Sequence, residues 1–272
     1  MKLFTVGDSI SQGFMSLAAA RTDLSYSTLI ARAMGLTFGE EYSYPKWAAG
    51  GLPLNLEDIL RRLNERYGND LSIFEALGVL RTIQEFAGEN KAYYETGPGR
   101  ATANAPKGVE YFHNVSVQGF DVADAWLVTP SLCKREIDLA QNAGAGGAVS
   151  VGPSAAFYRT ALKVLNPSLK REYDDYSQLD WLRHHVESPD GVENLVLWLG
   201  ANNALGTVVS LRIRQTPGDD VNRPEDMDHV TRDKVRKWNL WHPDDFEREY
   251  RRLLIKVDEI MRGDRDQNWK VL

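Results

Sequence analysis

Residues 2–9 read Lys-Leu-Phe-Thr-Val-Gly-Asp-Ser, a short apolar run followed at once by three turn residues. The run Lys2–Val6 is typical of a buried strand. Two later segments, Val109–Val117 and Leu195–Leu199, have the same form, and each runs on to a glycine. Strands that are apolar on both faces occur mainly in parallel sheets with helices on both sides. The sequence therefore predicts an α/β fold in which helices connect parallel strands.

Three stretches between and after these strands have the apolar spacing of amphipathic helices. Residues 55–68 begin with an asparagine suited to cap a helix and end with a glycine. Residues 72–88 begin with a Ser-x-x-Glu capping box, and residues 246–263 carry an apolar side chain every three or four positions. The last four residues, Trp269–Leu272, are typical of the opening of a fourth strand.

Two long connections do not fit this alternation, although nothing divides residues 1–272 into more than one domain. Residues 36–109, between the first and second strands, are long enough for an inserted helical cap. Residues 203–241 contain prolines, a run of acids and a basic cluster, which is typical of irregular loops and active-site walls. We expect these two segments to form the walls of a crevice. Their tryptophans then either contact a ligand or pack in the core, the commoner role of such residues; the three concerned are Trp47, Trp238 and Trp241.

Composition excludes several classes of protein. The chain has 43% apolar residues, and its 32 Lys and Arg against 38 Asp and Glu give a net charge of −6. A mildly acidic chain without a strongly basic block is a poor nucleic-acid binder. No apolar stretch approaches the ~20 residues of a transmembrane helix. The single cysteine, Cys133, excludes an internal disulfide and a cysteine-based zinc site, and no motif calls for another cofactor.

The N-terminus has no signal-peptide core, because its apolar run is shorter than the ~7 residues that such a core needs. A chain that starts natively at Met1 would therefore be cytoplasmic. A chain from which a signal peptide has been removed would be secreted.

Three residues at the predicted strand ends carry groups used in acyl transfer. Ser9 follows the first strand, Gly119 the second and Asn202 the third. Because the carboxyl ends of parallel strands meet at one crevice in a doubly wound sheet, we expect these residues to lie close together. A serine hydroxyl, a glycine N–H and an asparagine amide are the parts of a nucleophile and an oxyanion hole. Taken alone, Gly-Asp-Ser also suits a plain helix cap.

In these three motifs the chain resembles the GDSL-type, or SGNH, hydrolases. The motifs are Gly-Asp-Ser at 7–9, the glycine at 119, and Gly-Ala-Asn-Asn at 200–203, where the family has Gly-x-Asn-Asp. The resemblance implies a flavodoxin-like, three-layer α/β/α sandwich with a parallel sheet, here with a helical insertion between the first two strands. It also implies Ser9 as nucleophile, Gly119 and Asn202 as oxyanion donors, no cofactor, and a small-molecule or lipid ester as substrate.

The family's fourth motif, Asp-x-x-His, supplies the general base and the acid that orients it. Its one counterpart here is Asp226-Met-Asp-His229, whose polar setting without a preceding strand is more typical of a surface loop. His242 precedes a proline, as the family's histidine often does, but Asn239 stands where the aspartate should be. Asp226 and His229 are therefore only a weak candidate pair.

The remaining histidines are not expected to act as the base. His113 lies on a predicted strand and is expected to be packed or hydrogen-bonded. His184 and His185 lie in a polar helix and are expected to face the solvent.

A sheet that stops at Trp269–Leu272 would leave an edge unpaired. We therefore expect these residues to be an N-terminal portion of a longer polypeptide, with the catalytic Asp and His beyond Leu272 and a C-terminal fragment completing the sheet. The leading hypothesis is a serine esterase that forms an acyl-enzyme. The alternative is a non-catalytic ligand-binding protein that has the same fold and lacks the base.

Overall fold

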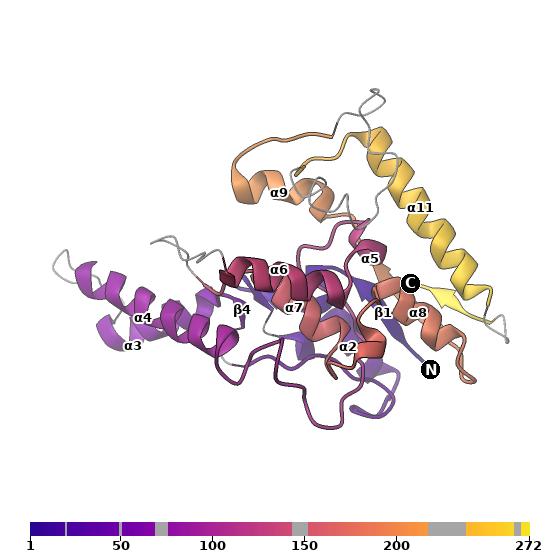
Figure 1. Cartoon of the computed structure of the whole chain (residues 1–272), viewed down its shortest axis with the longest axis horizontal. Coiled ribbons are helices and arrows are strands. Elements are labelled where there is room, and N and C mark those ends of the chain that lie inside the picture. Colours follow the sequence, from indigo (N-terminus) through magenta and orange to yellow (C-terminus); the bar gives the residue numbers. More distant parts are fainter. Residues whose placement is uncertain (20, 49–50, 69–75, 143–151, 217–237, 264–267) are drawn as a thin grey trace.

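The computed structural model in Figure 1 is a mixed α/β fold built around a three-stranded parallel sheet. Strand β1 (Phe4–Gly7) pairs with β5 (Asn194–Trp198), which pairs with β6 (Lys270–Val271). The first, third and fourth predicted strands are thus confirmed, with small shifts at their ends. The structure describes residues 1–19, 21–48, 51–68, 76–142, 152–216, 238–263 and 268–272.

The second predicted strand, Val109–Val117, is only partly formed. Residues 113–117 extend beside the other edge of β1. The N–H of Thr5 donates to the His113 carbonyl (2.9 Å), and the Thr5 carbonyl accepts from Val115 N–H (3.0 Å). The backbone of Thr5 forms hydrogen bonds with residues 113–117, whereas the neighbouring residues Phe4 and Val6 point their backbone groups toward β5. Strand β1 therefore lies between residues 113–117 and β5. The spatial order is therefore 113–117, β1, β5, β6, all parallel.

Helices cover both faces of the sheet, as predicted. On one face Phe4, Val6 and Leu195 belong to the main core. On the opposite face Leu3 and Val196 pack against α2 (Tyr26–Ala33). Successive residues of an extended segment point to opposite faces, so Leu3 and the strand that follows it contribute to both cores. The main core is completed by α6 (Pro130–Asn142), α7 (Ala156–Leu165), α8 (Gln178–Val186) and α11 (Pro243–Met261).

A small antiparallel ribbon follows β1 and was not expected from the sequence. The short helix α1 (Ser9–Gln12) leads into β2 (Phe14–Met15), which pairs with β3 (Ala18–Ala19), and β3 pairs with β4 (Leu52–Pro53). Between β2 and β3, Ser16 and Leu17 have positive φ angles of 52° and 63°, as a two-residue hairpin turn requires.

The interval 36–109 contains a hairpin of two helices that projects from the body in Figure 1, α3 (Leu56–Tyr67) and α4 (Ala76–Glu95). Helix α3 confirms the prediction for residues 55–68. Helix α4 continues past the expected end at Gly88, and the predicted capping box at residues 72–75 lies outside the described residues.

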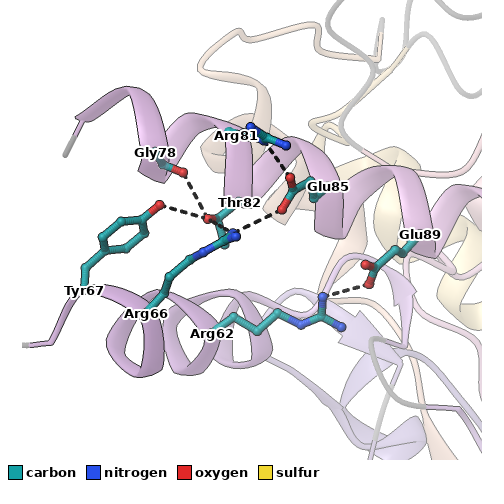
Figure 2. A network of polar contacts seen from close by, with 8 residues as sticks. All are labelled: Arg62, Arg66, Tyr67, Gly78, Arg81, Thr82, Glu85 and Glu89. Carbon is teal, nitrogen blue, oxygen red and sulfur yellow. Dashed lines mark hydrogen bonds and ion pairs between the residues drawn. The ribbon is translucent and has the colours of Figure 1, made fainter.

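Ion pairs join α3 to α4, as Figure 2 shows. Arg62 donates to Glu89 (2.7 Å), and Arg66 donates to both Glu85 (3.1 Å) and Thr82 (3.0 Å). The Arg62 guanidinium also lies 4.7 Å from the ring centre of the buried Phe86. Exposed pairs of this kind contribute little individually, and burial of the Phe86 side chain adds an apolar contribution to the stability of the hairpin.

The remaining elements connect this framework. They are η1 (Thr22–Leu24), α5 (Asp124–Leu127), η3 (Arg171–Tyr173) and α9 (Asn202–Ser210). Helix α11 confirms the predicted C-terminal helix. None of the helices in the described ranges combines the length and the hydropathy of a membrane-spanning segment.

Candidate functional site

Ser9 is the first residue of α1, directly after the carboxyl end of β1. Asp8 caps this helix, since its carboxylate accepts the N–H of Ile10 (3.0 Å). The Asp8 N–H donates to the carbonyl of Trp198 (3.0 Å), which fixes the turn against the end of β5. Ser9 is half-buried, and no described residue bonds its hydroxyl. Asp8 therefore forms the plain helix cap that the sequence allowed. The hydroxyl of Ser9 takes no part in this cap.

Gly119 occupies a position that a larger residue would strain. Its φ is 77°, and a Cβ there would lie 3.3 Å from the ring of Phe157. The preceding residue anchors the loop, because the N–H of Gln118 donates to Oε1 of Gln12 (2.9 Å) at the end of α1. Gly119 itself is exposed. The turn after residues 113–117 is thus held directly beside α1.

Asn202 begins α9 and connects the third turn to the second. Its Nδ2 donates to the Phe120 carbonyl (2.8 Å), and Oδ1 of the buried Asn203 accepts the N–H of Val122 (3.1 Å). The sequence predicted that the amide of Asn202 donates to an oxyanion. The structure shows one N–H engaged by Phe120, and an amide carries two. Within the described residues, no hydrogen bond uses the second N–H of Asn202, which can therefore serve a ligand.

The three predicted turns are consequently neighbours. The turn at Ser9–Gln12 is bonded to Gln118, and residue Phe120 is bonded to Asn202. Gln178, at the start of α8, binds two strand ends at once: its Nε2 donates to the carbonyls of Gly7 (2.9 Å) and Val115 (2.7 Å). No local sequence signal distinguishes this glutamine, because its partners lie far away along the chain.

Asp8 is the titratable group nearest to Ser9 in sequence, and it is buried. Burial raises the pKa of Asp8 to about 6, although the hydrogen bond from Ile10 N–H partly opposes this rise. Its second oxygen, Oδ2, has no hydrogen-bond partner among the described residues. The carboxyl therefore changes charge close to neutral pH.

Two of the described histidines are buried away from this site. His113 accepts the N–H of Ser43 at Nδ1 (2.9 Å), as the prediction of a packed, hydrogen-bonded histidine required. His184 is exposed as expected, but the prediction for His185 was wrong. The ring of His185 is buried against Tyr111 (4.5 Å between centroids) because its side of α8 faces the sheet.

His242 lies closer to the candidate site. Its Nδ1 accepts the N–H of Asp244 (3.4 Å) and thereby caps α11, and the N–H of the preceding Trp241 donates to the Asn203 carbonyl (2.9 Å). Asn239 is used structurally, since its Oδ1 accepts the N–H of Arg214 (2.7 Å). The other candidate pair, Asp226 and His229, lies outside the described residues.

Of the three tryptophans singled out in the sequence, Trp241 packs in the core. Trp241 is buried against Ala123 and Leu127. Trp47 is half-buried, and its indole N–H donates to Oγ1 of Thr22 (3.0 Å). Trp238 is half-buried as well. Within the described ranges, no three His, Cys, Asp or Glu side chains are grouped so that they could hold a metal ion.

Comparison with known proteins adds no relative: no family model, no curated protein and no solved structure matches this chain.

Proposed function

We propose that this protein is a serine hydrolase that cleaves carboxylic esters through an acyl-enzyme on Ser9. One observation carries the proposal. Three turns that are far apart in the sequence, each following a parallel strand or extended segment, are joined by the Gln118–Gln12 and Asn202–Phe120 hydrogen bonds. These turns bring a serine, a glycine N–H and an amide to the same end of the sheet.

In the proposed reaction Oγ of Ser9 attacks the ester carbonyl and its proton passes to a base. The N–H groups of Ser9 and Gly119 and the free N–H of Asn202 stabilise the tetrahedral oxyanion. The alcohol leaves with a proton, and water then attacks the acyl-enzyme to release the carboxylic acid and regenerate Ser9.

The resemblance to the GDSL-type hydrolases supports the finer part of the proposal. On that basis the fold is the flavodoxin-like, three-layer sandwich of that family, and the substrate is a small-molecule or lipid ester. The order 113–117, β1, β5, β6 is compatible with it, since doubly wound sheets place their crevice where the strand order reverses, here beside β1.

For the base, two histidines are to be compared. His242 is the described histidine whose neighbour contacts the Asn202–Asn203 turn, and its Nδ1 lies 3.4 Å from a carboxylate oxygen of Asp244. His229 is the alternative from the sequence motif. Replacing each by alanine and measuring hydrolysis of a chromogenic short-chain ester tests both, and full activity in the two variants would favour the base that the sequence led us to expect beyond Leu272.

The nucleophile is tested by Ser9→Ala and a fluorophosphonate probe, which labels only an activated serine. We expect wild type to be labelled at Ser9 and the variant to lose both labelling and hydrolysis. Asn202→Ala should lower turnover about 10²–10³-fold, as loss of one oxyanion donor typically does. Ser131→Ala, on the surface of α6, is the control and should behave as wild type. Wild-type turnover by Ser9→Ala would contradict the proposal.

A second candidate function is a non-catalytic binding protein on the same fold. The observation that favours it is the Ser9 hydroxyl, which no described histidine contacts. Under this alternative the probe does not label Ser9 in the intact protein.

A further inference from the structure

A pocket of about 420 Å³ lies at the opposite end of the 113–117 segment from Gly119. Three aromatic rings form much of its wall. The ring centroid of Phe38 lies 6.2 Å from that of Tyr42 and 5.9 Å from that of Tyr44. Val109 and Phe112 contribute further apolar surface. The volume and the aromatic lining suit a small apolar body such as an aromatic ring or a branched alkyl group.

The charge of the pocket lining is opposite in sign to the net charge of the protein. Among the described residues that line it, the charged ones are Lys46 and Lys163 and none is Asp or Glu, although the chain as a whole carries a net charge of −6. The pocket is therefore a positive site on an acidic protein.

Lys163 is the less usual of the two lysines. It projects from α7, is half-buried, and its Nζ lies 5.2 Å from the ring centre of Trp47. Lys134 and Lys170 each form an ion pair with a carboxylate, whereas Lys163 forms none with any described residue. Burial lowers the pKa of Lys163, and no neighbouring acid offsets that effect. An anion arriving in the pocket would restore the interaction that the partly desolvated ammonium lacks.

We propose that this pocket binds a small organic carboxylate with an aromatic or branched apolar body, whose carboxylate pairs with Lys163 and Lys46. The aromatic rings take the apolar body, and the two ammonium groups select for the anion. The site is separate from the candidate nucleophile, because Val109 and Phe112 precede the extended segment while Gly119 follows it. The proposal therefore does not depend on ester hydrolysis.

The probe is 2-naphthylacetate, compared with its neutral amide, 2-naphthylacetamide, by calorimetric titration of the full chain. We expect the acid to bind at least about tenfold more tightly than the amide, because a charge-assisted hydrogen bond in a partly desolvated site is worth that much. Lys163→Met keeps the length of the side chain and should abolish this preference. The matched control is Lys256→Met, since Lys256 also lies over a tryptophan, 5.8 Å from the ring centre of Trp126.

A second pair of variants keeps the result independent of folding defects. Val109→Trp narrows the pocket without altering its charge and should weaken binding of acid and amide alike. Ser9→Ala should bind the acid as wild type does. Equal affinity of wild type for acid and amide, or wild-type affinity in Lys163→Met, overturns the proposal. Loss of binding in Ser9→Ala with full binding in Lys163→Met also overturns it, because the ligand then occupies the other end of the sheet.

Discussion

Single residues at the candidate site are constrained by backbone geometry as well as by chemistry. The sequence correctly indicated that Ser9 and Asn202 follow strand ends, and Gly119 follows an extended segment instead; turn residues after apolar runs are a local signal. It could not indicate that Asn202 gives one N–H to Phe120, since that bond joins residues 82 positions apart. The same reason explains why Gln178 was missed.

Gly119→Ala tests whether the conformation at this turn matters for function. With φ at 77° and the Phe157 ring 3.3 Å from the added Cβ, alanine should strain the turn by about 1–2 kcal/mol and displace its N–H. Under the proposed mechanism ester turnover falls at least about tenfold.

Gly35→Ala is the matched control, because Gly35 also has a positive φ (72°) but has no atom within 4 Å of the added Cβ. It should show a similar loss in the free energy of unfolding and wild-type turnover. Equal turnover in both variants would show that the N–H of Gly119 is not needed.

Elements with local end signals were predicted well from the sequence, and elements without them were not. Helix α3 begins after the predicted cap Asn55 and ends before Gly68, as expected. Helix α4 runs through Gly88, because a glycine ends a helix when it takes a positive φ, and Gly88 does not. The strands β2, β3 and β4 have two residues each, too few to show an alternating pattern.

Asn55→Ala tests how much the cap contributes to α3. The Asn55 side chain accepts the N–H groups of Glu57 (3.0 Å) and Asp58 (3.3 Å). Loss of this cap should lower the stability of the first turn of α3 by about 1 kcal/mol. Amide exchange in that turn should therefore become about fivefold faster. Hydrogen exchange of the peptide covering residues 55–68 measures this.

Asn64→Ala, on the exposed face of the same helix, is the control for that measurement. Alanine has the higher helix propensity, so exchange in α3 should be unchanged or slower. Faster exchange in Asn64→Ala than in Asn55→Ala would contradict the role given to the cap.

At the scale of the whole molecule, buried titratable groups make stability depend on pH in opposite directions. Burial lowers the pKa of His113 to about 4 and that of His185 to about 3. Their stabilising contribution is complete above about pH 6.5 and is lost as the pH falls toward 4, because the unfolded chain then binds more protons. Asp8 acts in reverse. Its raised pKa gives a contribution that is present below pH 3.8 and lost as the pH rises through about 6.

On acidification from pH 6.5 to 4 the two histidines lower the free energy of unfolding, and the two buried carboxyls with raised pKa values, Asp8 and Glu249, oppose that loss. Each buried histidine contributes a slope of up to about 1.4 kcal/mol per pH unit. His185→Phe should lessen the loss of stability on acidification, because phenylalanine keeps a ring packed against Tyr111 and cannot be protonated. The substitution removes no described hydrogen bond at Nε2 of His185. His184→Phe, one position away and exposed, should change the pH dependence less than His185→Phe does, because burial is the larger cause of the lowered pKa of His185 and the charge of His184 the smaller one. Urea unfolding at several pH values measures the free energy of unfolding of each variant. If that free energy depends on pH as strongly in His185→Phe as in wild type, burial of this histidine is not a source of the acid sensitivity.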